Sequence, residues 1–343
     1  MNKEPSVSVI VLNYNGIRYL EACLSSLRSQ SYNNYEIIVY DNASTDVSVK
    51  FINQNFPEVV LIQGKRNVGF AKANNVAIDF ALEKNSDFVF LVNNDTSAEN
   101  TLIERLVANF QKQDSLGIIS PAVFNLYDRH TLQELGMTID KFGYPLAIKS
   151  SKDQARVFFV SGCAMMIKSE VLRKIGAFDE KYFMFAEDLD LCWRAQLAGY
   201  KVAVDEKAKI FHVGGGTLPG GVATELSYET NARRVFLREK NTLRTLLKNY
   251  DNENLLKIFP LSIILLCFEA FFWLSILKAE VGLSELNAIY YNIKFLPDTL
   301  QQRRFVQTLR KVSDREIQKT MIRGNGKLLF ISKVGLPRFH NSE

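Results

Sequence analysis

The sequence contains few of the residue patterns that mark a disulfide framework, a zinc site or a redox centre. Its 343 residues include four cysteines far apart in the chain, and no C-x-x-C pair occurs. Each cysteine lies in an apolar or helical context and is expected to be a small buried hydrophobe; the four are Cys23, Cys163, Cys192 and Cys267. This cysteine usage favours a reducing, cytosolic compartment.

Two common nucleotide-binding motifs are also missing. No G-x-G-x-x-G follows the first predicted strand, which argues against a dinucleotide site. No G-x-x-x-x-G-K-[ST] occurs in the chain, which excludes a P-loop. The N-terminal residues lead directly into a strand pattern, so we expect no signal peptide before the domain.

Charge of either sign is not in large excess. The formal net charge of +5 is too small to indicate nucleic acid as a partner, although it suits an anionic ligand or an anionic membrane. A hydrophobic content of 47% and a charged content of 23% are typical of globular proteins. The length is sufficient for one large domain or for two smaller ones.

The sequence does contain an alternation of strand and helix patterns. Helical spacing of apolar residues at 17–29 and 70–84 separates runs that are rich in β-branched and apolar residues. These runs predict strands at 7–12, 36–40, 59–62 and 87–92. The alternation predicts an α/β fold with a doubly wound, mostly parallel sheet.

The middle of the chain has a less regular pattern. After a helix at 101–113 and a strand at 117–121, the residues to about 155 lack a clear period, and we interpret them as loop and irregular β structure. Buried strands are predicted at 157–160 and 163–167, and two short strands at 201–204 and 208–211.

Polar side chains follow three of the predicted strands, at what would be one edge of the sheet. The segments are Asn13–Gly16, Asp41–Asp46 and Asn93–Asp95. Ligand crevices of open α/β sheets lie at the carboxyl ends of strands, and carboxylate and amide oxygens suit Mg²⁺ or Mn²⁺ beside substrate phosphates. Each segment is equally explained as a turn, because Asn and Asp favour turns.

The segment Asn67–Asn75 lies at the start of a predicted helix. Gly69 permits close backbone approach, a helix N-terminus attracts anions, and Lys72 and Asn74 add donors, so the segment suits an anionic ligand. An ordinary helix start explains it equally well.

Acidic residues occupy the first turn of a helix that ends before Gly199. The helix dipole is a sufficient reason for Glu187, Asp188 and Asp190 to lie there, and a general base at a cleft rim is the functional alternative. Asp190 is four residues before Arg194, so we expect these two to pair on the helix surface. His212, a single histidine before a glycine-rich loop, is interpreted as either a structural residue or a ligand.

These motifs together resemble those of the family-2 inverting glycosyltransferases. The segments Val7–Gly16, Asp41–Asp46, Asn67–Ala71, Asn93–Asp95 and Phe185–Arg194 follow the order and spacing of that family. The resemblance implies the GT-A fold, in which an α/β domain binds a nucleotide sugar. It is strongest to bacterial rhamnosyltransferase-like enzymes of polysaccharide assembly. We expect this domain at 1–235 and a helical region at 236–343.

The resemblance also implies roles for the residues of the site. The donor would be bound by Asn13, Asn15, Asp41, Gly69, Lys72 and Asn94. Mg²⁺ or Mn²⁺ would be held against the diphosphate by Asp95, with Asn93 and His212 as further ligands. Asn93 stands where the family usually has the first carboxylate of D-x-D, which lowers the negative charge of the site.

For the transfer itself, the resemblance implies that Asp188 deprotonates the acceptor hydroxyl, with Glu187 and Gly162 on the acceptor side. The donor would be a dTDP- or UDP-linked sugar such as rhamnose, and the acceptor lipid-linked or a polysaccharide. Two other hypotheses remain. One is a nucleotidyltransferase, against which the absence of a Gly-rich basic loop after the first strand argues. The other is a catalytically silent nucleotide-sugar-binding or scaffolding subunit.

The apolar run from Ile258 to Leu277 is close to the roughly 20 residues that a bilayer span requires. Glu269 in its middle and Pro260 near its start argue against a simple span. A membrane-embedded or re-entrant segment, a helix in the core or between copies of the chain, and a true span all stay open. The basic stretch 301–323 suits an anionic leaflet, and we expect the protein at the cytosolic face of the membrane.

Overall fold

The N-terminal strands pair in parallel and form the first half of the central sheet. In this computed structural model, which describes residues 4–214 and 228–339, β1 (Val7–Asn13) lies between β2 (Tyr35–Asp41) and β4 (Phe88–Asn93). β3 (Val60–Gln63) pairs with β2 at the sheet edge. The register places Asn13 beside Asp41 and Leu12 beside Asn93, so the predicted polar strand ends lie at one edge.

The second half of the sheet is mixed. β10 (Ala164–Lys168) lies antiparallel between β4 and β6 (Leu116–Asn125), and β11 (Lys201–His212) runs parallel to β6. β5 (Thr96–Ala98) closes this side antiparallel to β11, so the strand order is β3-β2-β1-β4-β10-β6-β11-β5. The short β7 (Leu132–Glu134) pairs with β6, while β8 (Met137–Ile139) and β9 (Pro145–Ala147) form a separate hairpin.

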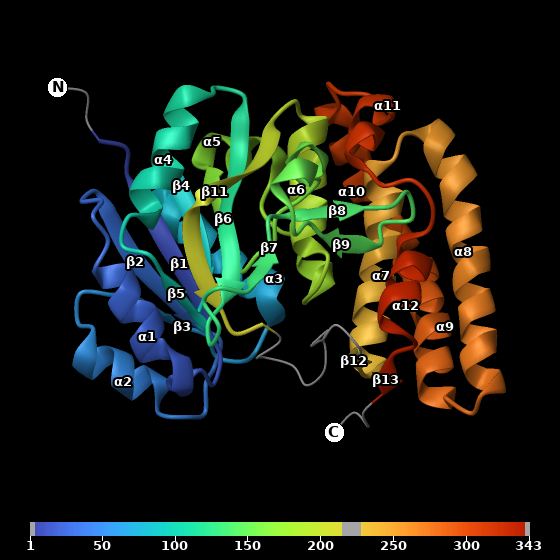
Figure 1. The fold of residues 1–343 in the computed structure, drawn as a ribbon, viewed down its shortest axis with the longest axis horizontal. Helices are drawn as coiled ribbons and strands as arrows, with labels where there is room; N and C mark the ends of the chain where they lie inside the picture. Colours follow the sequence, from blue (N-terminus) through green and yellow to red (C-terminus); the bar gives the residue numbers. More distant parts are fainter. Residues whose placement is uncertain (1–3, 215–227, 340–343) are drawn as a thin grey trace.

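Helices cover both faces of the sheet (Figure 1). α1 (Ile17–Arg28), α2 (Ser48–Asn55) and α4 (Leu102–Lys112) pack on one face, and α3 (Gly69–Glu83), α5 (Ser169–Ile175) and α6 (Glu187–Leu197) pack on the other. In β1, Val9 and Val11 lie in the hydrophobic core between the sheet and α1, α2 and α4. Ile10 points to the opposite face and lies in the core beneath α3, α5 and α6. Fully burying each such side chain stabilises the fold by about 1.5–3 kcal/mol.

The C-terminal residues form a helical region beside the sheet domain (Figure 1). Its long helices are α7 (Ala232–Asn249), α8 (Asn252–Ser275), α9 (Ala279–Lys294) and α10 (Leu296–Leu309). The shorter elements are α11 (Asp314–Ile317), α12 (Gly326–Val334), the strands β12 (Glu229–Thr230) and β13 (Arg338–Phe339), and the 3-10 turns η1 (Ser151–Arg156), η2 (Glu180–Tyr182) and η3 (Gln318–Thr320). α7 packs against α6, α9 and α10, and thereby joins the two regions.

The structure refines several sequence-based expectations about secondary structure. Residues 122–155, expected to be loop and irregular β structure, contain the end of β6 and the short strands β7, β8 and β9 between loops. The two short strands expected at 201–211 are one strand, β11, with irregular pairing between Asp205 and Lys209. Residues 157–160 are buried but form no strand beyond one isolated bridge at Phe159. The basic stretch 301–323 lies on α10, α11 and η3, and α10 ends before Arg310, whose backbone is extended.

One cysteine differs from expectation. Cys23, Cys163 and Cys192 are buried, whereas Cys267 is exposed on α8. Its helix packs on the protein through one side, and Cys267 lies on the other.

The expected surface pair of Asp190 and Arg194 is in fact buried. The Arg194 Nε–Asp190 Oδ2 distance is 2.9 Å, and both side chains are almost completely enclosed. Lys248 of α7 contacts Asp190 at 3.0 Å and Asp179 at 2.8 Å, and Arg244 contacts Asp179 at 2.8 Å. We call these five residues the α6–α7 network. Helix spacing predicted the pair, but α7, which covers it, comes from distant sequence.

Charges in the α6–α7 network compensate one another. Burial alone raises the pKa of Asp179, but the charges of Lys248 and Arg244 outweigh it and hold that pKa well below the usual range. Burial also raises the pKa of Asp190, but the charges of Lys248 and Arg194 outweigh burial, and the pKa is lower than that of an ordinary aspartate. Both carboxylates therefore stay ionised and bind α7 to the sheet domain.

Candidate active site

A cavity of about 820 Å³ opens at the carboxyl edge of the sheet. Its lining includes side chains from the ends of β1, β4 and β11, from the turn before α6 and from the start of α7. Eight of the predicted site residues line it: Gly69, Asn93, Asn94, Asp95, Gly162, Glu187, Asp188 and His212. The structure thus brings together residues that are up to 143 positions apart.

Asn13 and Asp41 lie behind the cavity wall. The Asn13 amide donates to Asp41 Oδ1 at 2.9 Å, and its carbonyl oxygen accepts from the Asn94 amide at 2.8 Å. Asp41 also accepts from the Ser44 backbone N–H at 2.9 Å and from the Ser44 hydroxyl at 2.6 Å. Neither Asn13 nor Asp41 lines the cavity, so in this structure they hold the strand-end turns in place. Their direct contact with a nucleotide stays a prediction.

Asn15 has a similar position. Its side-chain oxygen accepts from the Thr45 backbone N–H at 2.7 Å, and its backbone has a positive φ of 48°. This conformation suits Asn better than most residues. The contact fixes the β1 turn to the β2 turn beside the cavity.

The start of α3 uses its donors within the chain. The backbone N–H groups of Phe70 and Ala71 donate to the Phe183 carbonyl at 2.6 and 3.3 Å. Lys72 pairs with Glu180 at 2.7 Å, and Asn74 donates to the Phe70 carbonyl at 3.0 Å. Lys72 does not line the cavity. This geometry favours the ordinary helix start over an anion site, and donor binding by Lys72 gains no support from it.

Gly69 has a specific structural requirement. Its φ is +84°, and a Cβ at this position would lie 2.4 Å from the Phe183 ring and 2.7 Å from the Phe183 carbonyl oxygen. Only glycine fits both the conformation and the close approach. Gly69 therefore lets α3 support the turn that leads to Asp188.

That turn is strained. Phe183, Phe185 and Ala186 all have positive φ values, of 61°, 72° and 61°. Such conformations cost non-glycine residues free energy and persist where the surroundings enforce them, often at functional sites. Here Asn241 of α7 donates to the carbonyls of Tyr182, Met184 and Phe185 at 2.7–3.0 Å. The C-terminal region thus holds the turn that presents Asp188.

Asp188 lies at the cavity wall without a cationic partner among the described residues. Its Oδ2 accepts from the Gly162 backbone N–H at 3.1 Å, and its Oδ1 accepts from its neighbour Leu189 at 2.8 Å. Burial raises the pKa of Asp188, although these backbone donors reduce the effect. A raised pKa makes the carboxylate a stronger base near neutral pH.

Glu187 differs from its neighbour. Burial and then the charge of Asp188 raise the pKa of Glu187 well above its usual range. Its buried Oε2 has no hydrogen-bond partner. Burial therefore disfavours the charged form of Glu187 more strongly than that of Asp188. We call Glu187 and Asp188 the pocket carboxylates.

Asp95 and His212 face each other across the cavity floor. Asp95 Oδ1 lies 3.3 Å from His212 Nε2, yet this buried oxygen makes no hydrogen bond. The Gln133 amide donates to the His212 backbone carbonyl at 2.9 Å, which directs its own carbonyl oxygen to His212 Nδ1 at 3.3 Å. With a proton on Nδ1, the lone pair of Nε2 faces the Asp95 carboxylate.

Asp95 Oδ1 and His212 Nε2 are both electron-pair donors, and together they could bind one cation. A carboxylate oxygen and an imidazole nitrogen are common ligands of Mn²⁺-type ions, and a second hydrogen bond usually orients the imidazole. Asn93 lines the same cavity. The described residues include no group of three or more His, Cys, Asp or Glu side chains placed to hold a metal. Asp95, His212 and Asn93 therefore fit a metal that takes its other ligands from a diphosphate or water.

The sequence patterns missed several residues of the cavity. Gln133 and Glu134 come from β7, inside the stretch interpreted as irregular, and Arg233 and Arg234 come from the first turn of α7. The Arg234 guanidinium lies 4.8 Å from the Phe185 ring centroid, beside the strained turn. The two consecutive arginines were the available signal.

Comparisons with known proteins match this geometry. Residues 8–176 match the model for Glycosyl transferase family 2. The dTDP-rhamnosyl transferase RfbF of Shigella flexneri is 22% identical over 246 residues, which cover 71% of this chain and 81% of the relative. Rhamnosyltransferase WbbL of Escherichia coli (strain K12) is 24% identical over 212 residues, with 57% and 79% covered.

A third relative is the N-acetylglucosaminyl-diphospho-decaprenol L-rhamnosyltransferase of Mycobacterium tuberculosis (strain CDC 1551 / Oshkosh). It is 22% identical over 259 residues, with 68% of this chain and 84% of the relative covered.

Solved structures share the fold. GalNAc-T7 with UDP, GalNAc and Mn²⁺ superposes with a TM-score of 0.60 at 14% identity, over 74% of this chain and 49% of that one. Our chain thus spans about half of the GalNAc-T7 chain. The mannosyltransferase PcManGT from Pyrobaculum calidifontis in complex with GDP-Man and Mn²⁺ has a TM-score of 0.51 at 15% identity, with 90% and 86% covered.

The sheet, with a crevice at its carboxyl edge, has the GT-A fold of these solved structures. The match to glycosyl transferase family 2 covers residues 8–176, just under half of the chain. The fold class and the family resemblance predicted from the sequence are both confirmed. The boundary between a domain at 1–235 and a region at 236–343 stays a prediction.

Proposed function

We propose that this protein transfers a sugar from a nucleotide diphosphate donor to a hydroxyl group of a lipid-linked or polysaccharide acceptor, with inversion at the anomeric carbon. The observation that carries the proposal is that Asp188, a half-buried carboxylate with no cationic partner among the described residues, and the Asp95–His212 pair line one cavity. One group suits proton removal from a hydroxyl, and the other suits a diphosphate with its cation.

In the proposed reaction, Asp188 accepts the proton of the acceptor hydroxyl while the hydroxyl oxygen attacks the anomeric carbon of the donor sugar. The bond from that carbon to the diphosphate oxygen breaks on the opposite face, and the nucleotide diphosphate leaves. The Gly162 N–H, at 3.1 Å from Asp188 Oδ2, fixes the carboxylate toward the cavity. No cationic group pairs with Asp188 within residues 4–214 and 228–339, which favours this role because an ion pair would make the carboxylate a weaker base.

Asp95, His212 and Asn93 would hold Mg²⁺ or Mn²⁺ in this proposal. A bound cation there supplies positive charge that neutralises the leaving diphosphate. Gln133 keeps His212 Nε2 directed toward Asp95. The Mn²⁺ named with GalNAc-T7 and with PcManGT supports the same choice of ion.

The rhamnosyltransferase names of three relatives support rhamnose as the donor sugar. The dTDP in one of those names supports dTDP as the donor nucleotide, with UDP as the alternative. The diphospho-decaprenol in one of those names supports a lipid-linked acceptor. We accordingly propose that the enzyme works at the cytoplasmic face of the cell membrane. It is one of the enzymes that build cell-surface polysaccharide.

The test is a panel of nucleotide sugars with the purified protein, scored by ligand-induced stabilisation and then by sugar transfer. We expect a dTDP- or UDP-linked sugar to raise the melting temperature when Mn²⁺ or Mg²⁺ is present and to lose this effect with a chelator. A catalytically silent binding subunit would bind the nucleotide sugar but release no nucleotide diphosphate with any acceptor. Absence of metal-dependent binding to every nucleotide diphosphate would contradict the proposal.

A further inference from the structure

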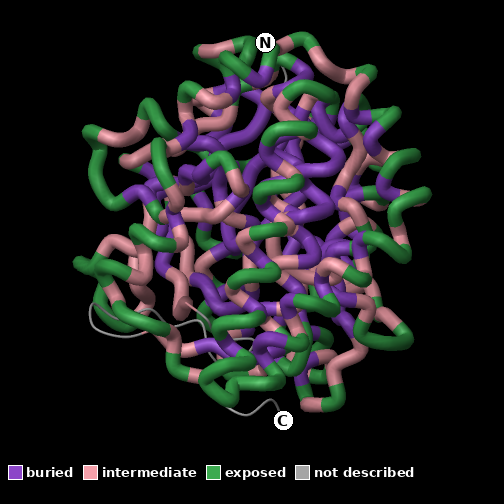
Figure 2. Tube along the Cα trace, turned by 90° about the vertical axis from the view of Figure 1, so that its right-hand side faces the viewer, coloured by how far each residue is buried: buried purple, intermediate pink, exposed green. Residues whose placement is uncertain are grey.

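The helical region exposes apolar side chains to an extent that the sheet domain does not. Only four large hydrophobic side chains are exposed before residue 250 among the described residues, whereas nineteen are exposed after it. Many of these lie on α8, α9 and α10. Contiguous apolar surface of this kind marks a binding face. Figure 2 views the side of the molecule on which these helices lie.

The outer face of α8 is the centre of this surface. Leu261, Ile264, Phe268 and Phe271 recur at intervals of three and four residues, and Phe268 and Phe271 are each 70% exposed. The helix is 24 residues long, and 22% of its most apolar window is buried. Most of an apolar helix therefore faces outward.

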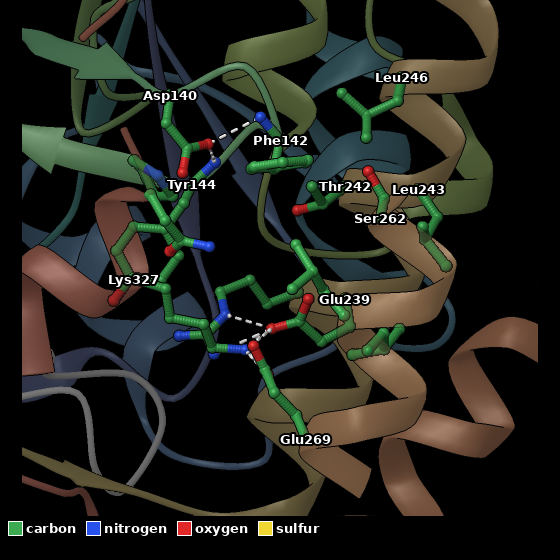
Figure 3. A pocket seen from close by; sticks show the side chains of 15 residues that line it. Asp140, Phe142, Tyr144, Glu239, Thr242, Leu243, Leu246, Ser262, Glu269 and Lys327 are labelled. Carbon is green, nitrogen blue, oxygen red and sulfur yellow. Dashed lines mark hydrogen bonds and ion pairs between the residues drawn. The ribbon is translucent and has the colours of Figure 1, made fainter. Parts of the chain in front are cut away.

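The one charged residue between Ile258 and Leu277, Glu269, does not disturb this face. It points inward and pairs with Lys327, which also contacts Glu239 at 3.2 Å (Figure 3). The polar hydroxyl of Ser262 also lies on the inner side, where it donates to the Ile258 carbonyl at 3.0 Å. The outer face consequently has no charge over about five helical turns.

Packing argues against a true span for this helix. α8 lies against α9 and α7, so a membrane that enclosed α8 would also enclose α7. α7 contains buried and half-buried charged residues such as Arg238, Arg244 and Lys248, and charges inside a bilayer are costly. A helix that is apolar on one side and attached to a folded domain on the other lies in the plane of the interface instead.

Charge decides between a membrane and a second copy of the chain. In the described residues 251–339, ten lysines and arginines are exposed but only three acidic residues. Two copies with the same basic excess would repel each other, whereas an anionic leaflet attracts basic groups near its surface. The combination of apolar face and basic surroundings fits an anionic lipid bilayer.

We propose that the outer face of α8, continued on α9 and α10, docks in the plane of an anionic membrane without crossing it. The inference rests on the proposed function for its purpose, because docking would bring the cavity to a lipid-linked acceptor. It adds the docking surface, its orientation and the lipid charge.

Cys267 provides a direct probe, since it lies on this face and the other three cysteines are buried. We would measure its reaction with a membrane-impermeant maleimide, with vesicles of neutral lipid and with vesicles that contain an anionic lipid. Anionic vesicles should slow labelling at least about tenfold, and neutral vesicles should slow it less. The double variant Phe268→Ser/Phe271→Ser should abolish the protection. Val47→Ser, at an exposed apolar position of the sheet domain, is the matched control and should retain it.

Labelling that no vesicle composition slows would overturn the inference. So would labelling that slows with protein concentration alone while the mass doubles, because that result assigns the face to a second copy. Nucleotide binding by the same samples is measured separately. A protein that binds nucleotide diphosphate but ignores vesicles contradicts only this inference, and one that docks but binds no nucleotide contradicts only the proposed function.

Discussion

Asp188 and Asp190 lie two residues apart at the start of α6, and the chain surrounds them in opposite ways. Asp190 contacts Arg194 and Lys248 in the α6–α7 network, and its pKa, although raised by burial, is lowered overall by these charges. Asp188 has backbone donors but no cationic partner among the described residues, and burial raises its pKa. Cationic partners make one carboxylate structural, and their absence leaves the other available for chemistry.

The largest expected effect is the loss of sugar transfer when Asp188, which lines the cavity, is substituted. Asp188→Asn keeps the shape of the side chain but removes the base, so we expect sugar transfer to fall by about 10²- to 10⁴-fold. Donor binding and the melting temperature should change little. Glu187→Gln is the matched control, because glutamine resembles the protonated state of Glu187. It should retain transfer within about tenfold. Equal losses in both variants would break the distinction between the two residues.

The next largest effect is a loss of stability when Lys248 of the α6–α7 network is substituted. Lys248→Met leaves Asp179 and Asp190 buried with less compensation, so the free energy of unfolding should decrease by about 3 kcal/mol or more. Chemical denaturation measures this change. Lys257→Met, at an exposed position on α8 whose ion pair with Glu253 is in solvent, is the control and should change little. If both variants were equally stable, the network would not hold α7.

Metal affinity should respond to Gln133, at a smaller magnitude. Gln133→Met removes the acceptor that orients His212, so the Mn²⁺ concentration needed for nucleotide binding should rise by about tenfold. Nucleotide binding measured across a manganese titration gives this value. The control Gln63→Met changes an exposed glutamine of β3 and should have no effect. An unchanged manganese requirement in Gln133→Met would show that His212 needs no orientation.

Local patterns predicted the early fold well. The strands to Asn93 and the helices α1 and α3 follow from β-branched runs and helical spacing, and these elements depend on residues that are neighbours in sequence. The family resemblance singled out Asn93–Asp95, Glu187 and Asp188, which line the cavity.

Features made by distant segments were not predictable in the same way. The burial of Asp190 depends on α7, and Gln133 reaches His212 from β7, 79 residues earlier in the chain. The Glu269–Lys327 pair likewise joins α8 to α12. Sequence showed that Glu269 would need a partner in an apolar helix, but only the fold identifies Lys327.

The pH dependence of sugar transfer tests the contrast between Asp188 and Asp190 most directly. Asp188 must be ionised to act as a base. Because its pKa is raised, transfer should be lost in acid at a higher pH than it would be with an ordinary aspartate as the base. The protein should stay folded through this range, because the lowered pKa values of Asp179 and Asp190 keep the network ionised to lower pH. We predict that transfer is lost before the fold, and that Glu187→Gln keeps the same acid limb. Transfer that persists until the protein unfolds in acid would contradict the account.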